Sequence, residues 1–174
     1  DASHSFGARH FNEPVGSCKW SDITVFSFHP VKIITTAEGG IATTNSKKLA
    51  ETMQIYRNNG ITKNSNLFVF KKKNQPWYYE QQTYGFNFRM NDISAALGLS
   101  QLERFRKFIK KRNVIANLYK KQLNNYPIKF QKILSYNLSS YHLFVIQFDL
   151  KKSKYSYKEI FKKFRSKSIY VNLH

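Results

Sequence analysis

The sequence predicts an α/β protein, because short strand-like apolar segments alternate along it with amphipathic segments of helical period. Residues 22–29 and 142–150 are rich in Phe, Val and Ile, as strands are. Leu102, Phe105 and Ile109 keep the three-four spacing of a helix with one apolar face. With 174 residues, 41% of them hydrophobic, the chain is long enough to bury a sizeable core.

The first expected strand, residues 22–29, ends at Pro30. A second short strand is expected over residues 33–36. Gly39-Gly40 then supplies a turn, so we expect residues 41–44 to return beside residues 33–36 as a hairpin partner.

Two helices are expected next. Asn45 is placed to cap a helix that runs to about Asn58 and stops at Gly60. A long segment with weak periodicity follows, and loops of this length are usually functional or mobile. Asn91 then caps a second helix, and the apolar spacing continues through residues 102–125, which predicts a long helix that bridges two domains.

The C-terminal third is expected to hold the strand 142–150 and a helix that ends near Ser166. Ser156 and Glu159 have the spacing of a capping box at the start of that helix. Residues 169–173 predict a last strand. Because the sequence stops on this strand and begins without Met, we expect the chain to be a piece of a longer protein.

The net charge of +19 comes from 29 Lys and Arg residues against 10 Asp and Glu. Such a charge is typical of nucleic-acid-binding proteins. The lysines, however, are scattered in short clusters and far outnumber the arginines, which favours a general compositional bias. The single cysteine, Cys18, excludes an internal disulfide and indicates a reducing, cytoplasmic location. No apolar run is long enough to span a membrane.

Lys32 is the most unusual residue, because it lies among apolar side chains in residues 26–34. Burial disfavours the charged form of an amine and makes it a nucleophile toward carbonyl carbons. The alternative is an exposed lysine at the end of a strand. Ser27 is of a type that phosphate sites use. Asp1 and His4 place a carboxylate and an imidazole together, and a carboxylate can hold a pyridine nitrogen protonated.

Several ordered motifs resemble those of the DegT/StrS-type sugar aminotransferases, and the resemblance covers the whole chain. They are Asp1-Ala2-Ser3-His4-Ser5-Phe6-Gly7-Ala8, Phe26-Ser27-Phe28-His29-Pro30-Val31-Lys32, Glu38-Gly39-Gly40, Arg57-Asn58-Asn59-Gly60-Ile61, Gly85-Phe86-Asn87-Phe88-Arg89-Met90-Asn91-Asp92-Ile93, residues 95–102 and Tyr141-His142-Leu143. Residues 76–82 and 171–174 are most similar to members that aminate C4 of a UDP-linked 4-keto-6-deoxy N-acetyl sugar on the route to pseudaminic acid.

The resemblance implies the fold type I architecture of pyridoxal-phosphate-dependent transferases, with a three-layer α/β/α large domain and a small α+β domain. The large domain would have a mostly parallel central sheet. Residues 1–103 would be the C-terminal half of the large domain, and residues 104–174 the bridging helix with an incomplete small domain. Ala37 stands where relatives usually have glycine.

The resemblance also implies roles for five residues. Lys32 matches the lysine that binds pyridoxal 5'-phosphate covalently and then moves protons. Asp1 matches the carboxylate that pairs with the pyridine nitrogen, and His4 lies beside the phenolic oxygen. Ser27 matches a hydroxyl donor to the phosphate. Asn87 matches an asparagine that reaches the phosphate from the neighbouring subunit of a homodimer.

Three further residues are weaker candidates. Arg89 would hold the subunit interface or the substrate, and a structural ion pair is an equal alternative. Trp77 and Tyr78 would border the sugar-nucleotide pocket, and buried packing is the alternative for both.

The implied function is transfer of an amino group, with glutamate as donor, to a UDP-linked keto sugar. No metal, membrane or nucleic-acid partner is expected, and the 174 residues alone are expected to be inactive. Three alternatives stay open: an aminotransferase for another nucleotide sugar, a sister enzyme that dehydrates a sugar, and a non-catalytic basic protein that binds nucleic acid.

Overall fold

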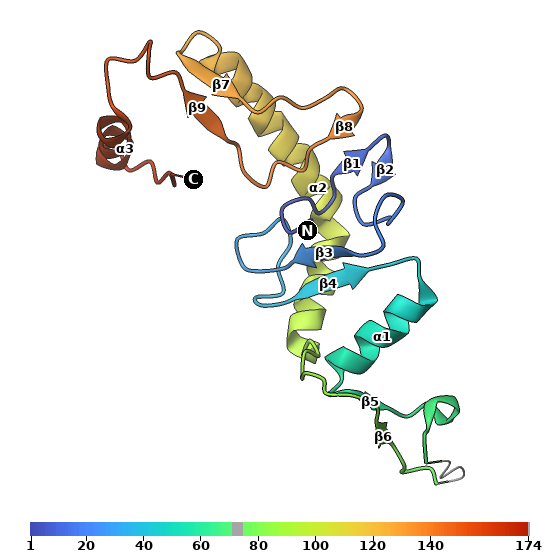
Figure 1. Ribbon diagram of the computed structural model, residues 1–174. Coiled ribbons are helices and arrows are strands. Elements are labelled where there is room, and N and C mark those ends of the chain that lie inside the picture. Colours follow the sequence, from blue (N-terminus) through green and yellow to red (C-terminus); the bar gives the residue numbers. More distant parts are fainter. Residues whose placement is uncertain (71–74, 174) are drawn as a thin grey trace.

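The computed structural model describes residues 1–70 and 75–173 (Figure 1). One long helix, α2 (Asp92–Leu123), runs along the molecule, and the other elements lie on it or beyond its two ends. The helix passes without a break through the expected domain boundary at residues 103 and 104. None of the helices in the described residues is long and apolar enough to cross a membrane.

The strands are short and form four small sheets, and every strand pair in the described residues is antiparallel. The pairs therefore differ from the mostly parallel sheet implied for a complete large domain. The strands are β1 (Arg9–His10), β2 (Glu13–Pro14), β3 (Thr24–Ser27), β4 (Gly40–Thr43), β5 (Ile61–Thr62), β6 (Glu80–Gln81), β7 (Ile128–Phe130), β8 (Asn137–Leu138) and β9 (Ile146–Phe148), and they pair in the orders β2-β1-β8, β3-β4, β5-β6 and β7-β9.

The helix starts agree closely with the sequence. The side chain of Asn91 caps α2 by accepting a hydrogen bond from the backbone of Ser94 at 2.9 Å, as expected. The expected capping box also begins α3 (Tyr157–Ser166). For α1 (Lys47–Arg57) the cap is Ser46 rather than Asn45, while a turn of 3-10 helix (Ser65–Leu67) lies in the long segment that follows.

The expected strand over residues 33–36 is wrong. These residues lie in a loop that joins β3 directly to β4, so β4 pairs with β3 and not with residues 33–36. Two backbone hydrogen bonds close the loop: Phe28 N–H donates to Gly39 at 2.8 Å, and Thr36 N–H donates to Phe28 at 3.0 Å. The apolar residues that suggested a strand instead form a turn, and their side chains are buried.

Two further strand expectations need correction. In the segment 142–150 only β9 pairs as a strand, because the chain bends at its first residues and the backbone oxygen of His142 accepts from Arg112 of α2. Residues 169–173 form no strand in the described part of the chain. After α3, Ser168 adopts a left-handed backbone with φ of 58° and Ile169 N–H donates to Phe164, so the chain turns back on the helix end.

The main hydrophobic core lies between β3, the loop after it and the middle of α2. Its buried residues are Ala2, Phe26, Phe28 and Ile34, and the half-buried Phe6, Val15, Met90, Phe105 and Phe108 pack against them. The aromatic ring of Phe6 meets the rings of Phe26, Phe28 and Phe105 edge to face. This core fixes both residues 1–8 and the loop that carries Lys32.

Candidate active site

Lys32 lies in the loop between β3 and β4, directly before two buried residues. Its backbone N–H donates to His29 at 2.9 Å, which forms a tight turn. Ile33 and Ile34 are only 5% and 1% exposed, so they anchor the turn in the core. Lys32 itself is half-buried. The sequence pattern of a lysine among apolar residues is therefore explained by a turn that buries its neighbours and presents the amine at the edge of the core.

The surroundings of Lys32 are basic and lack an acidic partner. In the described residues no carboxylate lies within ion-pair distance of its amine. His142 lies near enough to be affected by its charge. Burial first, and then the charges of His4, Lys32 and Arg112, together lower the pKa of His142 from 6.5 to about 4. The His142 imidazole is therefore neutral near pH 7.

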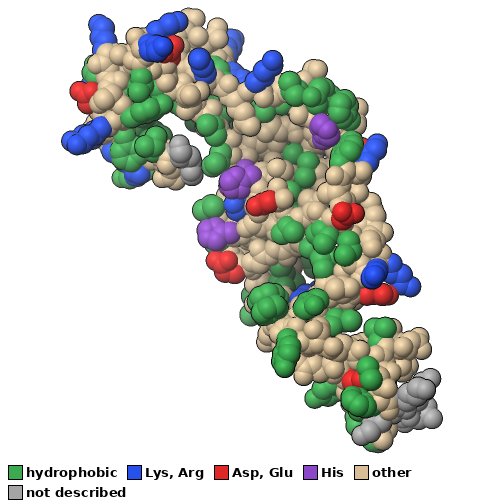
Figure 2. All heavy atoms as spheres, in the orientation of Figure 1, with side chains coloured by type: hydrophobic (Ala, Val, Ile, Leu, Met, Phe, Trp, Pro, Cys, Tyr) green, Lys and Arg blue, Asp and Glu red, His purple; other side chains and the backbone are tan. Residues whose placement is uncertain are grey.

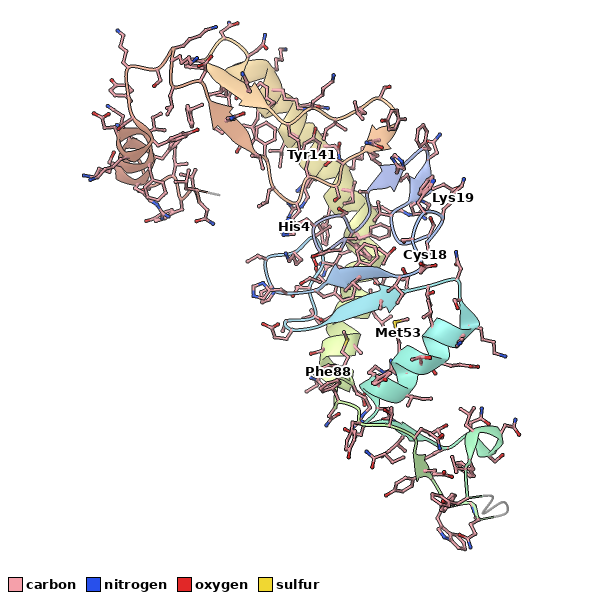
Figure 3. All side chains as sticks on the ribbon, in the orientation of Figure 1. His4, Cys18, Lys19, Met53, Phe88 and Tyr141 are labelled. Atoms are coloured by element: carbon pink, nitrogen blue, oxygen red, sulfur yellow. The ribbon has the colours of Figure 1, made fainter. Side chains whose placement is uncertain are left out.

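His4 contacts His142 directly, although the two are far apart in the sequence. Their ring centroids are 4.4 Å apart and the rings meet at 60°. The hydroxyl of Ser140, which is buried, also donates to the backbone oxygen of His4 at 3.3 Å. Figure 3 shows His4 and Tyr141 at this junction, where the blue N-terminal segment meets the orange segment that follows β8. The junction brings His4, a predicted site residue, together with a histidine for which no role was predicted.

Asp1 lies on the same N-terminal segment, which rests against β3. The carboxylate of Asp1 accepts a hydrogen bond from the backbone of Ser3 at 2.8 Å, and Ala2 N–H donates to Val25 of β3 at 2.8 Å. Asp1 is exposed and Ala2 is buried. The buried alanine therefore fixes the backbone beside β3, while the carboxylate stays accessible to a ligand.

Ser27 is the last residue of β3 and stands at the start of the Lys32 loop. It pairs with Gly40 of β4. Its side-chain oxygen accepts a hydrogen bond from the backbone of His29 at 3.4 Å, so its hydroxyl hydrogen is left to donate elsewhere. A side chain added to Gly40 would meet the backbone oxygen of Phe26 at 2.5 Å, so the turn requires glycine there.

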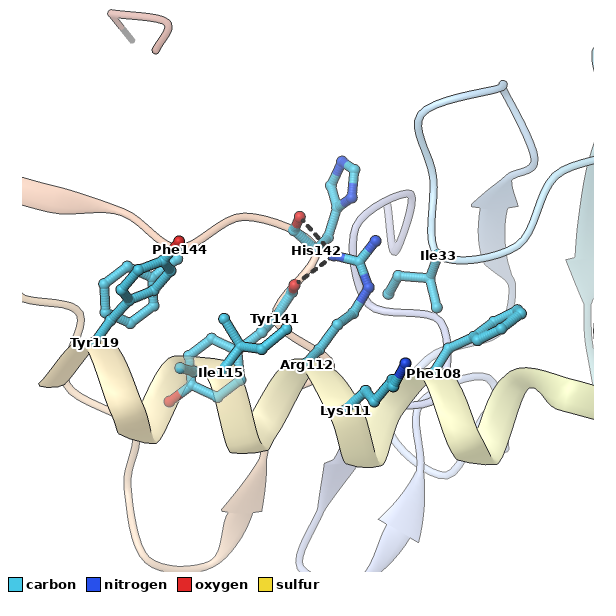
Figure 4. Close-up of a pocket in the computed structure, with 10 residues that line it drawn as sticks. Ile33, Phe108, Lys111, Arg112, Ile115, Tyr119, Tyr141, His142 and Phe144 are labelled. Carbon is cyan, nitrogen blue, oxygen red and sulfur yellow. Dashed lines mark hydrogen bonds between the residues drawn. The ribbon is translucent and has the colours of Figure 1, made fainter. Parts of the chain in front are cut away.

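Arg112 of α2 holds the segment that carries His142. Its guanidinium donates to the backbone oxygens of Tyr141 and His142 at 2.9 and 3.2 Å (Figure 4). The neighbouring Asn113 donates to Ser139 at 3.0 Å. A cavity of about 530 Å³ opens beside these contacts, lined by Ile33, Phe108, Lys111, Arg112, Ile115, Ala116, Tyr119, Tyr141, His142 and Phe144. No individual role was predicted for Arg112 from the sequence.

The structure does not bring Asn87 and Arg89 to this site. Residue Asn87 forms a β-bridge with Asn58, and the Arg89 guanidinium donates to the side chain of Asn58 at 2.8 Å. Figure 3 shows Phe88, between them, at the start of α2 and well away from His4. Both residues are exposed. The contact of Arg89 is a hydrogen bond with an amide, rather than the structural ion pair that was the alternative.

Trp77 and Tyr78 precede Asn87 in the sequence and lie in the segment that leads into β6. Trp77 is 74% exposed, which excludes buried packing within this chain. Tyr78 packs edge to face on Phe68, with ring centroids 5.0 Å apart. Burial first, and then the charge and hydrogen bond of Glu80, raise the pKa of Tyr78. Glu80 also accepts from Val69 N–H at 2.8 Å, so its carboxylate ties the segment together.

The side chains near Lys32 fit pyridoxal phosphate in their chemistry. The amine of Lys32 has no carboxylate partner among the described residues and suits an aldehyde. Asp1 offers a carboxylate to a pyridine nitrogen, and Ser27 offers a hydroxyl to a phosphate. The Nδ1 atom of His142 is buried and has no hydrogen-bond partner in the described chain. A buried unpaired nitrogen of this kind is satisfied when a polar group of a ligand occupies the site.

Solved structures of sugar aminotransferases share this fold. A protein of Streptococcus pneumoniae described as a sugar aminotransferase, in its PMP form, has a TM-score of 0.83 and 29% identity, and the alignment covers 100% of this chain and 42% of that one. The same protein was also solved in a PLP form. The chain therefore has the fold of pyridoxal-phosphate-dependent aminotransferases, as the sequence predicted.

The chain belongs to the DegT/DnrJ/EryC1/StrS aminotransferase family, whose profile matches residues 1–174. A UDP-4-amino-4,6-dideoxy-N-acetyl-beta-L-altrosamine transaminase of Campylobacter jejuni is 37% identical over 147 residues, which are 84% of this chain and 36% of that protein. The solved Helicobacter pylori PseC, an aminotransferase involved in pseudoaminic acid biosynthesis, is 33% identical with a TM-score of 0.79, covering 97% of this chain and 42% of that one. The chain thus spans between a third and a half of the length of these relatives.

Proposed function

We propose that the protein is a pyridoxal-phosphate-dependent transaminase that moves an amino group from glutamate to C4 of a UDP-linked 4-keto-6-deoxy N-acetyl sugar. The observation that carries this proposal is Lys32, a half-buried amine without a carboxylate partner in the described chain, beside the two imidazoles His4 and His142. The transaminases of Campylobacter jejuni and Helicobacter pylori support the choice of sugar.

Pyridoxal phosphate supplies an aldehyde carbon and an electron-accepting ring. The Nζ atom of Lys32 would be the nucleophile that holds this group, and as a free amine it would take and return a proton. Its loop suits this use, because two backbone hydrogen bonds close the loop and Ile33 and Ile34 anchor it. The backbone that carries the amine is therefore held in one place.

Other residues of the chain orient the bound group. The Asp1 carboxylate would keep a proton on the pyridine nitrogen, and its backbone is fixed by Ala2 against β3. His4 would donate to the phenolic oxygen. Ser27 would donate its hydroxyl hydrogen to the phosphate. All three residues stand on or beside β3, the strand that leads into the Lys32 loop.

A homodimer with a shared site accounts for the position of Asn87. The residue is exposed in the segment that precedes α2, where its backbone bridges to Asn58, and this exposure suits contact with the phosphate bound by a partner subunit. The surface around it is apolar: Tyr84, Phe88 and Ile93 are 93%, 70% and 86% exposed. An apolar surface of this kind is typical of subunit interfaces.

The experiment uses the whole protein with glutamate and a set of nucleotide-linked 4-keto sugars. The products are identified by mass spectrometry. We expect the protein to aminate the UDP-linked 4-keto-6-deoxy N-acetyl sugar, and we expect no aminated product with the Lys32→Ala variant. If a GDP-linked keto sugar is aminated faster, the proposed sugar is wrong but the proposed reaction, transamination, still holds. Loss of water from the sugar without gain of nitrogen would overturn the proposal.

A further inference from the structure

We propose that His142 is a positioning residue for His4, and that Arg112 holds His142 in place. The inference rests on the proposed function in one respect, namely that His4 lies beside the bound cofactor. It concerns residues of three separate segments: the N-terminal turn, the middle of α2 and the segment between β8 and β9.

The first step is the ring contact. His4 is exposed, and its ring meets that of His142 at 4.4 Å between centroids. The backbone of His4 is held on the same side, since the Ser140 hydroxyl donates to its oxygen at 3.3 Å. The segment 140–142 thus contacts both the backbone and the side chain of His4. An edge-to-face pair of this kind restricts the rotation of an otherwise exposed ring.

The second step is the support of His142 itself. Arg112 donates to the oxygens of Tyr141 and His142, and Asn113 donates to that of Ser139. Tyr141 has a left-handed backbone with φ of 44°, so these contacts hold a bend that a non-glycine residue adopts at a cost. The bend turns the His142 ring toward His4 and Lys32. Because α2 is continuous and packs on the core, the position of His142 is tied to the same framework as the Lys32 loop.

The third step is the charge of the pair. His142 is neutral near pH 7, as its lowered pKa shows, so it can stand beside Lys32 and Arg112 without adding a positive charge. A lysine or arginine in its place would add a positive charge beside Lys32. A neutral ring at residue 142 thus contacts His4 without placing another positive charge beside Lys32. A neutral aromatic residue such as phenylalanine should preserve this ring contact.

The test compares His142→Ala, His142→Phe and Arg112→Lys in the whole protein, with His29→Phe as the matched control. His29 is an exposed histidine of the same loop as Lys32 that has no ring contact with His4 in the described residues. Two quantities are measured: the histidine ring resonances of the cofactor-free protein, and the dissociation constant for pyridoxal phosphate. The His4 resonance is assigned as the one that is missing from the spectrum of a His4→Ala variant.

We expect His142→Ala to shift and broaden the His4 resonance and to raise the dissociation constant about tenfold, the equivalent of one lost ring pair. In His142→Phe, the His4 resonance and the dissociation constant should be close to those of the unsubstituted protein. Arg112→Lys should shift the resonances of His4 and of His142. The control His29→Phe should change neither the His4 resonance nor the dissociation constant. An unchanged His4 resonance in His142→Ala would overturn the inference. If the resonance moves but no variant and not even the unsubstituted protein binds pyridoxal phosphate, the proposed function fails while the contact stands.

Discussion

Gly98 of α2 faces Thr36 so closely that a methyl group on Gly98 would lie 2.8 Å from the Cγ2 atom of Thr36. Thr36 is only 2% exposed, and its hydroxyl donates to Glu38 at 2.8 Å. The absence of a side chain at residue 98 therefore lets α2 pack directly on the end of the Lys32 loop.

Substitution Gly98→Ala should displace this loop. Crowding of a packed contact costs about 1–3 kcal/mol, against about 1 kcal/mol gained from the helix propensity of alanine. We expect a lower melting temperature and slower reaction of Lys32 with pyridoxal phosphate, while Ser100→Ala on the exposed face of the same helix should change neither. If the two variants have the same melting temperature and the same rate of reaction with pyridoxal phosphate, the contact between Gly98 and Thr36 is not tight.

Ala37→Gly should stabilise the protein. Ala37 has φ of 66°, in the left-handed region where the side chain of alanine costs about 1–2 kcal/mol. The gain is reduced by the greater freedom of glycine in the unfolded chain, which leaves a net stabilisation of about 0.5 kcal/mol. The control is Ala42→Gly in β4, which should lower the melting temperature. We expect the melting temperature to rise in Ala37→Gly and to fall in Ala42→Gly. A lower melting temperature in both variants would contradict the prediction.

The stability of the protein should fall with acid partly because of His142. Its pKa is about 4 in the folded protein and about 6.5 when unfolded, so the unfolded state binds the proton more tightly. The stabilisation from neutral His142 is complete above about pH 6.5 and is lost as the pH falls toward 4. The groups that hold this pKa down are His4, Lys32 and Arg112, after burial.

The matching measurement is the melting temperature of the protein and of His142→Phe between pH 6.5 and 4.5. The variant should lose less stability over this range, and nuclear magnetic resonance should place the pKa of His142 well below its ordinary value. A pKa near 6.5 would show that His142 is not buried beside Lys32.

Glu80→Ala should loosen the segment around Trp77 and Tyr78. Glu80 is 5% exposed, and both of its oxygens accept from Val69 N–H, at 2.8 and 3.1 Å. A hydrogen bond to a charged group contributes about 1.5–3 kcal/mol, and this substitution removes it. We expect faster hydrogen exchange at the Val69 amide and a Tyr78 pKa closer to its ordinary value. Glu51→Ala, at an exposed position of α1, is the control. Unchanged exchange at Val69 would contradict the role of Glu80.

The helices were well predicted from the sequence because their signals are local. Caps such as Asn91 and the Ser156–Glu159 box act within one turn, so residue types a few positions apart suffice. The strand expected over residues 33–36 failed because buried turns and strands share apolar composition. What separates them here is the contact with Gly98, a residue more than sixty positions away.

In the candidate site, too, local motifs could be read from the sequence, whereas contacts between distant residues could not. Lys32, Asp1, His4 and Ser27 were predicted as site residues because each lies in a motif with a recognisable residue type. His142 was quoted in a motif but received no role, since its position beside His4 depends on Arg112 and on the bend at Tyr141. Contacts between segments separated by more than a hundred residues leave no periodic signal in a single sequence.

The central claim is that Lys32 binds pyridoxal phosphate, and mass spectrometry after reduction tests it most directly. The whole protein is mixed with pyridoxal phosphate and treated with borohydride, which fixes the cofactor to any lysine that holds it, and its peptides are then mapped. The account predicts one stoichiometric adduct on Lys32, none in Lys32→Ala, and none at stoichiometric level when the 174 residues are treated alone. Adducts spread over many surface lysines of the whole protein, with Lys32 no more modified than the rest, would contradict it.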